Sequence, residues 1–241
     1  MKKLGVIGGL GPLATEYFYS LINKMTDANR DQDHIEMMIY SKPSIPDRTG
    51  YILGKSQENP IIPMVEVGKI LDDLGVDYIA IPCITGHNFY EELASKIPVP
   101  IIHMVKETAA YLNRQGIRCV GIMATEGTIY SKLFQKELIQ YGISAVVPSK
   151  EKQEIVNSLI YDNLKVNIPP DMDKFAAVSE ELWQMGAEVN ILGCTELSLI
   201  KRDYPLGPNY LDAMEVLAVK SIELCGAGVK EDYKNLISTE D

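Results

Sequence analysis

The chain has 241 residues, of which 46% are hydrophobic and 23% charged, and its formal net charge is −10. This composition is typical of a folded globular protein with one large domain or two small ones. The excess negative charge repels phosphate groups, so we expect neither a nucleic acid nor an anionic membrane surface as a partner.

Three further features bear on the location of the protein. No apolar segment reaches the roughly 18 residues of a membrane-spanning helix, so we expect no membrane association. The apolar run after Lys3 contains Gly8, Gly9, Gly11 and Pro12 and no small-residue cleavage site, which favours a buried strand and turn over a secretion signal. The four cysteines form no CxxC pair. We therefore predict free thiols, no metal site and a cytoplasmic location.

Strands and helices are predicted to alternate along the chain. In chain order, the patterning predicts a strand at residues 4–7, a helix at 15–25, a strand at 35–40, a helix at 62–74, a strand at 78–81, a helix at 85–94, a strand at 101–102, a helix at 105–112, a strand at 119–123, a helix at 130–141, a strand at 144–147, helices at 151–163 and 172–185, a strand at 189–192 and a helix at 211–224. Such alternation is typical of α/β proteins with parallel sheets.

The two halves of the chain share a pattern that ends in cysteine. Cys83 follows Gly75 by eight residues, and Cys194 follows Gly186 by eight residues, so both landmarks are offset by 111 residues. In each copy a helix-ending glycine, a hydrophobic residue and an acid precede a strand. Any α/β protein repeats its hydrophobic pattern, but patterning does not explain the aligned cysteines. We therefore predict two pseudo-symmetric parallel-sheet α/β domains, with a cysteine on each wall of the cleft between them.

Paired thiols suit a proton transfer that inverts a chiral carbon. One thiolate removes the proton from one face, and one thiol returns a proton to the other. A free thiol has a pKa of about 8.5, and a helix N-terminus after each strand is expected to lower it, with Thr85 capping the helix after Cys83. A single cysteine at a strand end is more often a small buried hydrophobe. That is our interpretation of Cys119 and Cys225.

The residues around the two cysteines resemble the aspartate/glutamate racemase family, whose members need no pyridoxal phosphate. The matching segments, in the family's order, are Gly8-Gly-Leu-Gly-Pro-Leu-Ala-Thr15, Pro46-Asp-Arg-Thr49, Pro82-Cys-Ile-Thr-Gly-His87, Ala124-Thr-Glu-Gly-Thr128 and Leu192-Gly-Cys-Thr-Glu-Leu197. The resemblance implies a homodimer, no cofactor and a catalytic pair formed by Cys83 and Cys194. With the pseudo-symmetry, it predicts a first domain of residues 1–112 plus 213–241 and a second of residues 113–212.

The same resemblance assigns substrate-binding residues for an acidic amino acid, aspartate or glutamate. Arg48 and Lys165 match positions that bind the distal carboxylate, for which a guanidinium fork is well suited. The other substrate-binding candidates are Gly9 and Leu10 in the glycine-rich turn, and Thr85, Thr125, Thr128 and Thr195, for which helix capping is the alternative. His87 and Glu196 are candidates for tuning a thiol, although His87 also fits a packing role.

One departure from the family keeps alternatives open. Ile84 stands where the family commonly has asparagine, and it cannot hydrogen-bond the α-groups of an amino acid. The main alternative is therefore a decarboxylase or isomerase of a small diacid on the same fold. A binding module without chemistry is a further alternative. A dinucleotide-binding protein is another, because residues 9–14 fit G-x-G-x-x-A, although Pro12 removes an N–H there and no acidic residue closes the second strand.

Overall fold

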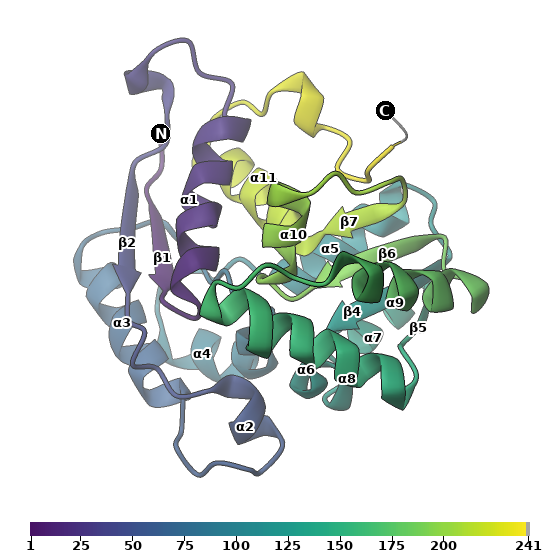
Figure 1. Ribbon diagram of the computed structural model, residues 1–241. Coiled ribbons are helices and arrows are strands. Elements are labelled where there is room, and N and C mark those ends of the chain that lie inside the picture. The colour runs from purple at the N-terminus through teal and green to yellow at the C-terminus, as the bar shows by residue number, and fades with distance from the viewer. Residues whose placement is uncertain (240–241) are drawn as a thin grey trace.

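Two parallel β-sheets form the framework of the computed structural model, which describes residues 1–239 (Figure 1). The first sheet has the order β2 (Met37–Ser41), β1 (Leu4–Gly8), β3 (Tyr78–Ala80). The second has the order β5 (Ser144–Val146), β4 (Cys119–Ala124), β6 (Val189–Gly193), β7 (Tyr210–Asp212). In each sheet the strand that comes first in the chain, β1 or β4, is an inner strand. All the neighbouring strands of the two sheets pair in parallel. The prediction of two pseudo-symmetric α/β units is confirmed.

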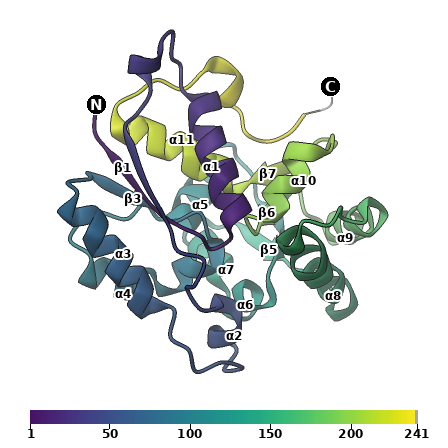
Figure 2. The same cartoon turned by 60° about the vertical axis from the view of Figure 1, so that its left-hand side comes forward.

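Helices cover both sheets (Figure 2). They are α1 (Pro12–Met25), α2 (Arg48–Ile52), α3 (Ile61–Asp73), α4 (Tyr90–Lys96), α5 (Met104–Arg114), α6 (Glu126–Tyr130), α7 (Leu133–Leu138), α8 (Lys150–Ser158), α9 (Met172–Gln184), α10 (Leu197–Asp203) and α11 (Ala213–Cys225). Short 3-10 turns occur at Asp31–Asp33, Ile84–Phe89, Ile139–Tyr141, Leu164–Val166 and Glu231–Tyr233, and a π-helical turn at Leu159–Asn163.

The core is continuous between the two sheets. Val6 of β1 and Ile122 of β4 belong to one buried cluster, to which α1, α5, α7 and α11 contribute apolar side chains. Ile7, the next residue of β1, points to a second cluster with α3 and α4. Met123 of β4 points to a third with α8 and α9. Successive strand residues face opposite sides, so the inner strands β1, β4 and β6 are buried on both faces, as in most parallel sheets, while the edge strand β2 is partly exposed.

The repeated glycine-to-cysteine pattern corresponds to the same local structure in both halves. Gly75 follows α3 with φ +71, and Gly186 follows α9 with φ +96. This left-handed conformation ends a helix and suits glycine because it has no Cβ. Strands β3 and β6 come next, and the two cysteines follow them. Cys83 and Cys194 thus occupy equivalent positions at the carboxyl ends of parallel strands.

Three predicted helices differ from the observed ones because side-chain contacts decide where they begin. The helix predicted at 130–141 is divided, since Thr125 caps α6 early and Lys132 adopts a left-handed φ of 55 before α7. The chain after Cys83 begins as a 3-10 turn, and Thr85 does not cap it because its hydroxyl bonds to other threonines. Residues 211–212, predicted as the start of a helix, belong to β7, and Asp212 caps α11.

Other differences concern short elements. Helices α2 and α10 were not predicted, and the strand predicted at 101–102 is a single bridge between Ile79 and Ile101. None of the helices within residues 1–239 combines the length and apolar character needed to cross a bilayer.

Candidate active site

The carboxyl ends of strands from both sheets converge on one pocket. It lies where ligands bind in open parallel sheets. Nine predicted site residues line it: Leu10, Arg48, Cys83, Thr85, Thr125, Lys165, Cys194, Thr195 and Glu196. Gly9 lines an adjoining pocket, which shares Arg48, Lys165 and Glu196 with the first. Both cysteines therefore line the same pocket.

Arg48 connects the Cys83 side of the pocket to the turn after β1. Asp47 caps α2 by accepting a 2.6 Å hydrogen bond from Gly50 N, and this short helix holds Arg48 almost fully buried. The guanidinium donates to the carbonyl oxygens of Leu10 and Pro46, both at 3.0 Å. Its Nε has no partner within residues 1–239. Burial by itself lowers the pKa of Arg48. The adjacent Cys83 sulfur and the acidic neighbours have the larger combined effect and raise the pKa overall, so Arg48 is a permanent cation.

Cys83 lies beside the Arg48 cation, whereas Cys194 lies beside an acidic residue. Its Sγ donates a 2.9 Å hydrogen bond to Oε2 of Glu196, which is itself 5% exposed. Burial, and then the charge of Glu196, raise the pKa of the Cys194 thiol well above its usual value, and Lys165 offsets this only in part. The expectation that a following helix lowers this pKa is wrong, because desolvation and a nearby like charge outweigh the backbone dipoles. In the free protein Cys194 is a thiol.

Three threonines form a hydroxyl cluster on the pocket wall. Thr85 Oγ1 lies 3.0 Å from Thr125 Oγ1 and 3.2 Å from Thr128 Oγ1, and the last two are 3.1 Å apart. Thr85 follows β3 and Thr125 follows β4, so the cluster joins the two halves. Thr128 is buried and does not line the pocket. Hydroxyl groups both donate and accept, so the cluster can present O–H groups to a carboxylate.

The sequence did not identify three residues that line the pocket: Asp47, Thr49 and Tyr161. Tyr161 comes four residues before Lys165, a spacing that places two side chains on one helix face and was a usable signal. The Lys165 ammonium lies 4.4 Å from the centroid of the Tyr161 ring. Ile84, the departure from the family pattern, lines the pocket at 2% exposure and gives it an apolar wall.

His87 lies outside the pocket. It is 2% exposed, and its Nε2 contacts the carbonyl oxygen of Ile81 at 3.1 Å. Burial, followed by the neighbouring His103, lowers the pKa of His87 to about 3, so the ring is neutral. This environment fits the packing role for His87, whereas Glu196 contacts a cysteine directly.

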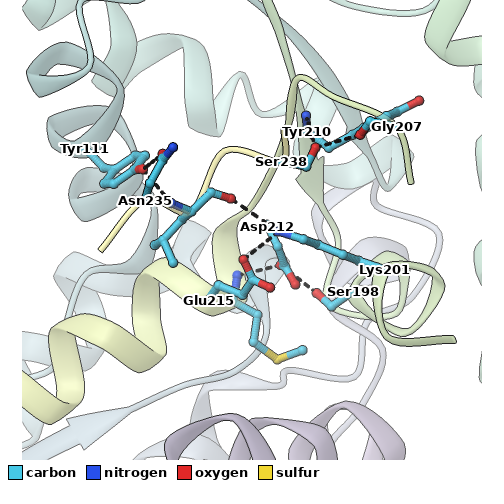
Figure 3. A network of polar contacts seen from close by, with 11 residues as sticks. Tyr111, Ser198, Lys201, Gly207, Tyr210, Asp212, Glu215, Asn235 and Ser238 are labelled. Carbon is cyan, nitrogen blue, oxygen red and sulfur yellow. Dashed lines mark hydrogen bonds and ion pairs between the residues drawn. The ribbon is translucent and has the colours of Figure 1, made fainter. Parts of the chain in front are cut away.

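The segment after Cys194 is anchored to α11 through a buried polar network (Figure 3). Ser198 of α10 donates a 2.7 Å hydrogen bond to Asp212, the residue that caps α11. One turn later, Lys201 forms a 2.7 Å ion pair with Glu215, and its ammonium also donates to the carbonyl oxygen of Leu236. Because α10 begins three residues after Cys194, these contacts help to hold the turn that carries the thiol.

A sequence model of the Asp/Glu/Hydantoin racemase family matches residues 7–220. The chain belongs to this family. The broad specificity amino-acid racemase RacX of Bacillus subtilis (strain 168) is 30% identical over 204 residues, which cover 82% of this chain and 86% of RacX.

Solved structures of racemases have the same fold. The aspartate racemase of Picrophilus torridus has a TM-score of 0.86 at 30% identity, covering 97% of this chain and 98% of its own. An aspartate racemase homologue from Pyrococcus horikoshii OT3 has a TM-score of 0.75 at 26% identity, covering 93% and 99%. Together the comparisons support racemase activity on amino acids for this member of the family and do not favour a decarboxylase or diacid isomerase.

Proposed function

We propose that the protein racemises an acidic amino acid, aspartate or glutamate, with Cys83 and Cys194 as the two acid–base groups and without an organic cofactor. The observation that carries the proposal is that both cysteines line one pocket from equivalent strand ends of the two halves. This arrangement suits an inversion, in which proton removal and proton return occur on opposite faces of the α-carbon.

The two thiols have different surroundings in the free protein, which supports different roles for them in the first proton transfer. Cys83 lies beside the Arg48 cation. Cys194 retains its proton because it is buried next to Glu196. In one direction Cys83 takes the α-proton while Cys194 donates its own to the other face, and the reverse reaction needs the opposite protonation.

The remaining pocket residues fit the two ends of an amino diacid. The threonine cluster and nearby backbone N–H groups offer donors for the α-carboxylate, where negative charge grows as the α-proton leaves. Lys165 and the free Nε of Arg48 offer positive charge to the side-chain carboxylate.

The test follows the α-proton of L- and D-aspartate and L- and D-glutamate by NMR in deuterated buffer without added cofactor, with chiral analysis of the products. We expect loss of the α-proton signal together with inversion. Cys83→Ser and Cys194→Ser should each lower the rate by at least about 100-fold, since an acid or base group contributes on that scale.

Cys119→Ser serves as the matched control because Cys119 lies at the start of β4, outside the pocket, and its rate should stay within about twofold of the original. A cysteine variant with a near-normal rate would contradict the two-thiol mechanism. No exchange with any of the four amino acids would contradict an acidic substrate.

A further inference from the structure

The helix that carries Lys165 loosens next to the pocket. Helix α8 ends at Ser158 and continues as a π-helical turn over Leu159–Asn163 and a 3-10 turn over Leu164–Val166. Asn167 then takes a left-handed φ of 58. Such π-turns are rare and occur often at functional sites, because they change the direction in which side chains project from the helix. Here the loosened segment carries two pocket-lining residues, Tyr161 and Lys165.

The hydroxyl group of Tyr161 lacks a partner. Its oxygen is buried, yet it forms no well-aligned hydrogen bond with any residue in 1–239. Burial raises the pKa of Tyr161, and a contact with the Thr49 hydroxyl, which falls short of hydrogen-bond geometry, counteracts this only in part. The group is therefore a neutral phenol that is able to donate a hydrogen bond. A buried hydroxyl without a partner is destabilising, and native proteins keep few of them.

The neighbours of Tyr161 are suited to an anionic ligand. The Lys165 ammonium lies over the tyrosine ring, 4.4 Å from its centroid, and both residues share the pocket with Cys194 and the Arg48 cation. One carboxylate in the pocket is able to accept from the phenol and the ammonium together. A neutral side chain of the same size leaves the phenol unpaired, and sites with such groups discriminate strongly against ligands that cannot pair them.

We infer that Tyr161 is a substrate-binding residue that determines specificity, because its hydroxyl donates to the side-chain carboxylate that Lys165 also binds. The inference rests on the proposed function, since it takes an acidic amino acid as the occupant of the pocket. It adds a third group to the two cations at that end of the substrate and gives an acceptor to the Tyr161 hydroxyl, which has no partner within residues 1–239. The ring of Tyr161 acts separately, by holding the ammonium of Lys165 against its face.

The decisive variant is Tyr161→Phe, which removes the hydroxyl and keeps the ring beneath Lys165. Calorimetric titration with L-aspartate and with L-glutamate gives the affinity without requiring turnover. We expect the better ligand to bind about tenfold or more weakly to Tyr161→Phe, since a hydrogen bond to a charged group is lost. Urea unfolding should show equal or greater stability for the variant, because it loses a buried group that has no partner. Tyr130→Phe, at a position 69% exposed, is the control and should match the original protein in both measurements.

The outcomes separate this inference from the proposed function. Equal affinities for Tyr161→Phe and the original protein would overturn the role of Tyr161 alone. Ligand binding by the original protein without exchange of the α-proton would contradict the proposed racemisation, while a weakened Tyr161→Phe would still support the binding role. If the original protein binds neither amino acid, both proposals are wrong. A loss of stability in Tyr161→Phe would indicate that the hydroxyl supports the fold rather than the ligand.

Discussion

The thiol of Cys194 donates a 2.9 Å hydrogen bond to the buried carboxylate of Glu196, two residues later in the same turn. The other carboxylate oxygen of Glu196 has no partner within residues 1–239. Because the carboxylate lies beside the sulfur, ionisation of Cys194 would place two negative charges together in a buried site. Together with burial, Glu196 therefore keeps Cys194 protonated.

Glu196→Gln should lower the pKa of the Cys194 thiol, because it removes a negative charge and keeps the side chain's size. We expect the pH of half-maximal alkylation of Cys194 to fall by about one unit or more, the usual scale for a close charge. Mass spectrometry of iodoacetamide-treated protein resolves Cys194 from the other three cysteines. Glu126→Gln, which removes a half-exposed carboxylate of α6, should leave the midpoint unchanged. An unchanged midpoint in Glu196→Gln would show that burial alone raises this pKa.

Gly127→Ala should disturb catalysis more than folding. A Cβ at Gly127 would lie 3.0 Å from Cα of Thr49, so α2 must move by a few tenths of an ångström away from α6. Since α2 carries Arg48, the shift displaces a pocket residue, and we expect kcat/KM to fall about three- to tenfold, because small errors in position slow reactions strongly. The free energy of unfolding should fall by only about 1 kcal/mol.

The control for that prediction is Gly207→Ala, at a glycine whose Cβ would meet no atom within 4 Å. Its kcat/KM and its stability should both match the original protein. Equal kcat/KM in Gly127→Ala and Gly207→Ala would mean that the contact between α2 and α6 does not position Arg48.

Glu215 gives the stability of the protein a dependence on pH. Burial, followed by the charge of Asp212, raises the pKa of Glu215 from 4.5 to about 7 even though Lys201 is its ion-pair partner. Between these pH values the folded protein keeps a proton that the unfolded chain releases. The free energy of unfolding therefore falls as pH rises from about 4.5 to about 7.

Glu215→Gln should flatten this decline, which urea unfolding at a series of pH values measures. Glu223→Gln is the matched control, because Glu223 is an exposed acid on the same helix and should leave the slope unchanged. Identical slopes for the original protein and Glu215→Gln would contradict the prediction.

The larger elements were predictable from the sequence because their signals are local. Strands β1, β4 and β6 appear as short apolar runs between turn residues, and α3 and α9 show helical periodicity closed by glycine. Helices α2, α6 and α10 have only five to seven residues, which is too short for a periodic pattern to stand out. Strand β7 was missed because it runs directly into the apolar helix α11. The domain boundaries and the homodimer remain predictions.

The sequence by itself determined that Cys83 and Cys194 occupy equivalent positions in the two halves. Each follows a helix-ending glycine by the same number of residues, and strand length is a local property. Only the tertiary structure decided how the two thiols differ. Arg48 is distant from Cys83 in sequence but lies beside it in the fold, and the free hydroxyl of Tyr161 reaches the same pocket from another helix. The protonation of a buried group depends on desolvation and on charges brought from separate elements, and neither is encoded in the spacing of residues along the chain.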